Sequence, residues 1–74
     1  MLNTSRQIEI KYFVIGEIAH YKSVGASPSQ AAMWLAADYL RHLGISEREY
    51  ACPIIKSEWP EAYAEIESNF SHRL

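Results

Sequence analysis

Residues 8–15, IEIKYFVI, decide the fold class of this 74-residue chain, because their apolar side chains fit two different structures. At a period of two, apolar residues alternate with polar ones, as in a half-buried strand: Ile8, Ile10, Tyr12 and Val14. Gly16 and Glu17 would then form a two-residue turn into a second strand. The same residues also give a broad apolar face on a helical wheel. We expect the β-hairpin, and with it an α+β fold; the alternative is an all-α three-helix bundle.

The next stretch, SPSQAAMWLAADYLRHLGIS, predicts a capped helix. Ser27 and Gln30 have the spacing of a capping box, and Pro28 suits the first helical turn. Gly44 stands where helices often end in the left-handed conformation. The expected helix therefore covers residues 29–43. Its predicted core residues share one side of the wheel: Ala32, Met33, Leu35, Ala36, Tyr39, Leu40 and Leu43.

The last part of the chain predicts one short strand and one helix. YACPIIKS has apolar residues at period two, and Pro53 restricts such a strand to the edge of a sheet. Ser57 then precedes a helical stripe made of Trp59, Tyr63, Ile66 and Phe70, and we expect it to cap that helix. The complete expectation is a single domain over residues 1–74, in the order hairpin, helix, short edge strand and C-terminal helix.

Composition limits the classes of function. The chain has 7 Lys and Arg against 9 Asp and Glu, which gives a formal net charge of -2 and argues against a non-specific nucleic-acid binder. Charged residues interrupt the apolar residues near the N-terminus, so neither a signal peptide nor a membrane partner is expected. A lone Cys52 forms no intramolecular disulfide, and this favours a cytoplasmic location.

The sequence contains fragments of catalytic and metal sites but no complete set. Cys52 with His20 or His42 combines a thiol and an imidazole, and no local signature accompanies them. Glu17 with His20, and Asp38 with His42, supply two ligands each, which is fewer than a metal site needs. We therefore expect no enzyme, no metal and no cofactor.

The segment LGIS, with Ile45 and Ser46, resembles the turn of the helix-turn-helix family of DNA-binding proteins. The resemblance covers only the region around this turn, and it implies DNA contacts by Arg41 and Arg48. Leu40 stands where the family usually has a small residue that lets two helices approach. A helix-turn-helix-like DNA-binding regulator is therefore the alternative function.

Two further features oppose the DNA-binding interpretation. Glu47 and Glu49 flank Arg48 on the helix that would enter the DNA groove, where carboxylates are repelled by phosphates. Pro53 is expected to end that helix after little more than one turn. Nucleic acid is therefore not the partner that we expect.

Trp34 departs from the core pattern of its helix. At 100° per residue it projects among three polar residues: Gln30, Asp38 and Arg41. Such a tryptophan is typical of a binding anchor, although burial by the C-terminal aromatic residues or a homodimer would also explain it. Our leading hypothesis is a small non-enzymatic module that binds another protein through these four residues. It would be an inhibitor or adaptor of the kind that phages and mobile elements direct at a host protein complex.

Overall fold

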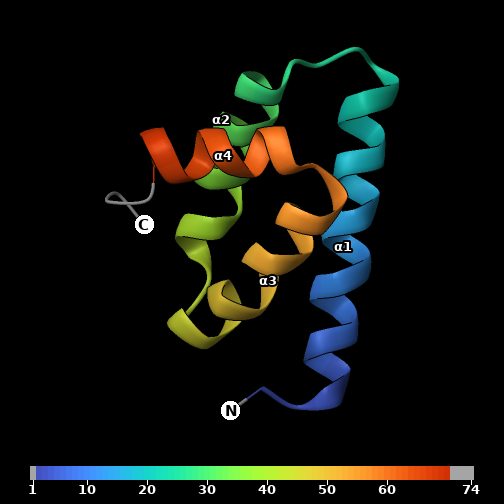
Figure 1. Cartoon of the computed structure of the whole chain (residues 1–74). Helices are drawn as coiled ribbons and strands as arrows, with labels where there is room; N and C mark the ends of the chain where they lie inside the picture. The colour runs from blue at the N-terminus through green and yellow to red at the C-terminus, as the bar shows by residue number, and fades with distance from the viewer. Residues whose placement is uncertain (1, 71–74) are drawn as a thin grey trace.

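The computed structural model describes residues 2–70, and these form four α-helices, one short 3₁₀-helix and no β-strand. The order is α1 (Thr4–Ser23), α2 (Pro28–Asp38), η1 (Leu40–His42), α3 (Ile45–Glu58) and α4 (Pro60–Asn69). α1 packs chiefly on α3, and α4 packs across both α2 and α3 (Figure 1). The fold is all-α, so the predicted α+β class is wrong and the helical-bundle alternative fits.

Residues 8–15 lie in the middle of α1 and not in a hairpin. A period of two would have buried Ile8 and Tyr12, yet these side chains are 50% and 64% exposed. The residues that α1 does bury recur every four positions: Ile10, Val14 and Ile18. An isolated hairpin is marginally stable in water, whereas a helix satisfies its backbone hydrogen bonds internally and packs its apolar face on another helix.

The predicted edge strand is also helical, because α3 continues through Pro53. A proline inside a helix leaves the carbonyl of residue 49 without its usual donor and costs about 3 kcal/mol. Pro53 and Glu49 are both exposed, whereas Ala51 and Ile55 on the opposite side are fully buried. Burial of this apolar face therefore keeps the segment helical in spite of the proline.

The single helix predicted over residues 29–43 is divided in two. α2 ends at Asp38, Tyr39 leaves the helical conformation with φ -130° and ψ -66°, and η1 follows. Gly44 has φ -69° and ψ 168°, so it is the extended residue before α3 and not the predicted left-handed end of α2. Its N–H donates to Oε1 of Glu47 at 2.9 Å, which satisfies one of the free amides at the start of α3.

The start of α2 agrees with the sequence, but part of its predicted buried face does not. The capping box is confirmed: the Gln30 N–H donates to Ser27 Oγ at 3.1 Å, and the Ser27 N–H donates to Gln30 Oε1 at 3.2 Å. The prediction that Met33 lies in the core is wrong, because its side chain is 46% exposed. The buried face is turned away from Met33 and consists of Ala31, Ala32, Leu35 and Ala36.

α4 follows α3 with Trp59 as the single residue between them. Ser57, predicted to cap the last helix, therefore lies inside α3, and Pro60 is the first residue of α4. Trp59 and Ile66 are buried, whereas Tyr63 and Phe70 pack on the core from its edge. The predicted stripe is thus the core-facing side of α4 and of the residue before it.

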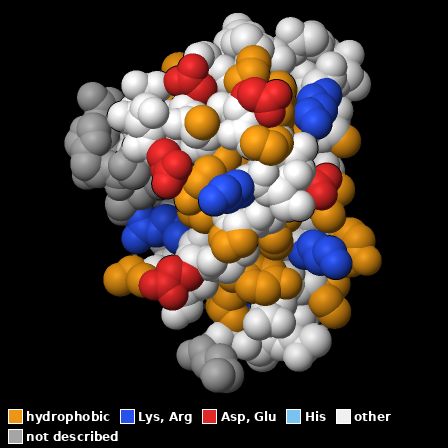
Figure 2. All heavy atoms as spheres, viewed as in Figure 1, with side chains coloured by type: hydrophobic (Ala, Val, Ile, Leu, Met, Phe, Trp, Pro, Cys, Tyr) orange, Lys and Arg blue, Asp and Glu red, His pale blue; other side chains and the backbone are white. Residues whose placement is uncertain are grey.

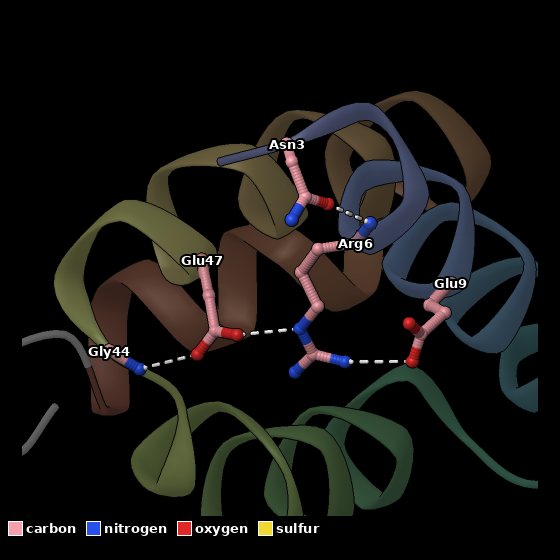
Figure 3. Close-up of polar contacts among 5 residues, drawn as sticks. All are labelled: Asn3, Arg6, Glu9, Gly44 and Glu47. Carbon is pink, nitrogen blue, oxygen red and sulfur yellow. Dashed lines mark hydrogen bonds and ion pairs between the residues drawn. The ribbon is translucent and has the colours of Figure 1, made fainter. Parts of the chain in front are cut away.

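α1 and α3 are joined near both ends and run parallel. Near the start of each helix, Arg6 Nε donates to Glu47 Oε2 at 2.6 Å (Figure 3). Near the other ends, Lys22 Nζ donates to the backbone carbonyl of Glu58 at 3.1 Å and lies 5.1 Å from the centre of the Trp59 ring. These contacts fix the register of α1 on α3, and α1 presents another side toward α2.

Candidate functional site

The structure separates the four residues that the sequence grouped around Trp34. Gln30, Trp34 and Asp38 lie on α2, whereas Arg41 lies in η1, beyond the break at Tyr39. Helical spacing therefore does not relate Arg41 to Trp34. Gln30, Asp38 and Arg41 are exposed, and Trp34 is half-buried. The predicted group is thus divided between two elements, and three of its four residues share α2.

Trp34 is half-buried because it packs against α1. Its ring lies 5.1 Å from that of Tyr21, centre to centre, with an angle of 50° between the planes. This separation is typical of favourable aromatic pairs. Its ring partner is thus an aromatic residue of α1, not one of the C-terminal aromatic residues that the sequence suggested.

A second aromatic pair also joins α1 to the segment formed by α2 and η1. The ring centres of Phe13 and Tyr39 are 4.5 Å apart, with 36° between the planes, and Phe13 is 46% exposed. Phe13 and Tyr21 are eight residues apart, which places them about two turns apart along one side of α1. We call the four residues Phe13, Tyr21, Trp34 and Tyr39 the aromatic seam.

Two carboxylates border the aromatic seam. Glu17 lies on α1 one turn from both Phe13 and Tyr21, and Asp38 lies on α2 one turn from Trp34. Burial raises the pKa of Tyr21 to about 12, and hydrogen bonding to Glu17 and the negative charge of Asp38 act in the same direction. Both carboxylates are therefore close enough to act on Tyr21. Within residues 2–70, neither forms an ion pair.

Tyr39 was predicted as a core residue and not as part of this site. Three further members, all on α1, were not predicted as site residues: Phe13, Glu17 and Tyr21. The predicted hairpin places Glu17 in its turn, whereas the observed helix brings all three residues to one side of α1. Their spacing of four and four places them on one ridge if the segment is helical. The helical periodicity of residues 4–23 is therefore the sequence feature that predicts these three residues as neighbours.

A different apolar face lies over α3 and the N-terminal half of α1, where hydrophobic side chains gather in the space-filling view (Figure 2). Ile8 and Tyr12 on α1 are exposed, and Tyr50 and Ile54 on α3 are partly buried against the core. Among the described residues, no ring contact fixes Tyr12 against a second helix. Unlike the aromatic seam, this face is apolar without a ring pair at Tyr12 among the described residues.

The helix that would read DNA is longer than predicted, because α3 extends to Glu58. Its packing nevertheless differs from the close helix pair that the resemblance implies, since α3 packs on α1 and α4, and α2 packs on α4 and η1. Leu40 is fully buried in the core, and Glu49 is exposed on α3. This packing of α2 and α3 does not support the prediction that Arg41 and Arg48 contact the bases in a DNA groove.

The remaining fragments of catalytic and metal sites stay apart. Burial raises the pKa of the Cys52 thiol against the effect of the nearby Arg48 charge, whereas reactive cysteines have a lowered pKa. Within residues 2–70, no three His, Cys, Asp or Glu side chains come together as a metal site. In the same part of the chain, no helix has both the length and the apolar character needed to cross a membrane.

Comparison with known proteins adds no relative. The sequence matches no family model, and no curated protein or solved structure is significantly similar to it.

Proposed function

We propose that this chain is a small protein-binding module of the inhibitor or adaptor type, that it acts in the cytoplasm, and that the aromatic seam docks its partner. The observation that carries the proposal is the presence of two ring pairs that join α1 to the segment of α2 and Tyr39: Phe13 with Tyr39, and Tyr21 with Trp34. Aromatic residues dominate the binding energy of protein interfaces. Rings already held by neighbours lose little conformational freedom when a partner binds, which favours affinity.

The aromatic seam is a better docking surface than the apolar face over α1 and α3. Tyr12 and Ile8 are more exposed, but an exposed apolar side chain by itself is common on protein surfaces. The seam combines partly exposed rings with carboxylates, and this mixture of apolar and polar groups is typical of specific interfaces. A second copy of the chain is the competing occupant of either face.

Phe13 and Tyr12 provide a matched pair of variants for testing the proposal. They are adjacent, aromatic and exposed, yet Phe13 belongs to the seam and Tyr12 does not. We expect the wild-type chain and Tyr12→Ala to capture the same polypeptide from an extract of the source organism, in near-stoichiometric amount. Phe13→Ala should lose it. Far-ultraviolet circular dichroism establishes that both variants keep the helical content of the wild type.

Three results would contradict the proposal. Loss of the polypeptide with Tyr12→Ala but not with Phe13→Ala would place the docking surface over α1 and α3. Capture of no polypeptide by the wild type would remove the protein-binding function. Sedimentation equilibrium that shows a wild-type dimer and a Phe13→Ala monomer would make a second copy the occupant of the seam.

A further inference from the structure

The negative charge at the aromatic seam is not neutralised by the described part of the chain. Arg6 is the basic residue whose charge acts on Tyr39 at one end of the seam. Its guanidinium is already engaged, with Nε 2.6 Å from Glu47 and Nη1 3.4 Å from Glu9. Arg6 is therefore committed to joining α1 and α3, and no other Lys or Arg of residues 2–70 forms an ion pair with Glu17 or Asp38.

We infer that the seam binds an arginine side chain from a basic segment of the partner protein. The guanidinium group would stack on the ring pair of Tyr21 and Trp34. It would also donate hydrogen bonds to the carboxylates of Glu17 and Asp38. This inference rests on the proposed function and adds the chemistry of the partner. A guanidinium group is flat and permanently charged, stacks on aromatic faces, and donates paired hydrogen bonds to carboxylates. The seam supplies both kinds of acceptor side by side.

Octa-arginine peptide is a suitable probe of this chemistry, with octa-lysine and octa-glutamate for comparison. Two-dimensional ¹⁵N–¹H NMR follows the two indole N–H signals, which are assigned with a Trp34→Phe variant. Octa-arginine should shift the Trp34 signal in a saturable manner and leave the signal of the buried Trp59 unchanged. Octa-lysine should bind more weakly because an ammonium group lacks the planar donor geometry, and octa-glutamate should not bind.

A double variant, Glu17→Gln with Asp38→Asn, should weaken octa-arginine binding by about tenfold. The matched control is Glu49→Gln with Glu61→Gln, which changes the net charge equally at two exposed carboxylates on α3 and α4. The control should change the affinity by no more than about twofold, because only non-specific attraction is altered. Circular dichroism verifies the fold of both double variants.

Equal weakening by the two double variants, or chemical-shift changes centred on α4, would show general attraction to an acidic surface and overturn the inference. So would the absence of any octa-arginine binding. If the inference fails in one of these ways while Phe13→Ala still loses its captured polypeptide, the partner is not basic but the protein-binding function stands. If Phe13→Ala also retains its polypeptide, the proposed function is contradicted as well.

Discussion

Arg6 and Glu47 stand 41 positions apart in the chain, and their side chains meet at 2.6 Å. The other carboxylate oxygen of Glu47 accepts the backbone N–H of Gly44 at 2.9 Å (Figure 3). One side chain therefore both caps the start of α3 and holds the start of α1 against it. The hydrogen bond from Gly44, followed by that from Arg6, lowers the pKa of Glu47.

The lowered pKa of Glu47 predicts a specific dependence of stability on pH. In the unfolded chain the carboxyl titrates near its ordinary value of about 4.3. Above this value the carboxylate stabilises the fold, and the contribution is lost as the pH falls through the lower pKa of the folded chain. The melting temperature of Glu47→Gln should therefore fall less steeply than that of the wild type between about pH 5 and pH 2.

Glu61→Gln is the control for this measurement, because Glu61 is an exposed carboxylate on α4. Its variant should keep the pH dependence of the wild type. A Glu47→Gln curve parallel to the wild-type curve over the same range would show that the Gly44 and Arg6 contacts do not stabilise the fold.

Replacing Gly16 by alanine should stabilise the protein by roughly 0.5–1 kcal/mol. Gly16 lies inside α1, and a Cβ atom added there meets no atom within 4 Å. Urea unfolding measures the gain. Gly25→Ala should have the opposite effect, because Gly25 has φ 78° and a side chain is strained in that conformation. The same sign for both variants would contradict this account of α1.

Replacing Pro53 by alanine should raise the free energy of unfolding by roughly 1–3 kcal/mol. The alanine N–H can donate to the carbonyl of Glu49 within α3, and the proline ring no longer crowds that turn. Pro60→Ala is the matched control, because Pro60 starts α4, where no intrahelical hydrogen bond is missing. Urea unfolding of both variants provides the measurement, and equal effects would argue against a continuous α3.

Leu40 and Met33 test which residues of the middle segment form the core. Leu40 is fully buried in η1, so Leu40→Ala should lower the free energy of unfolding by about 2–5 kcal/mol. Met33 is 46% exposed, and Met33→Ala should change the free energy of unfolding by about 0.5 kcal/mol or less. Chemical denaturation gives both values. A large loss with Met33→Ala would restore the buried face predicted from the sequence.

Interactions between residues close in the chain allow some elements of this fold to be predicted, whereas packing between helices determines the others. The capping box of Ser27 and Gln30 located the start of α2, because it depends on residues three positions apart. The first segment was misassigned because its β-branched and aromatic residues favour strands locally, while packing of α1 on α3 decides otherwise. Pro53 misled the prediction for a related reason, since burial of Ala51 and Ile55 outweighs its local effect.

The candidate site was predictable only on its α2 side. Sequence periodicity predicts Trp34 as a site residue, because it places Trp34 outside the apolar face of its own helix. Its pairing with Tyr21 depends on how α1 packs beside α2, and no local pattern encodes that contact. Arg41 was included because a helix was assumed to continue past Asp38, and the turn at Tyr39 removes that relation.

The packing of α1 on α3 also sets an order of events during synthesis. α1 leaves the ribosome before α3, because Glu47, which holds the start of α1, follows Arg6 by 41 positions. Until α3 emerges, the apolar side of α1 has no lasting cover, and its docking must close a long stretch of chain. α1 is therefore secured only after α3 has been made, and a nascent chain interrupted before α3 leaves Ile10, Val14 and Ile18 without the cover of that helix.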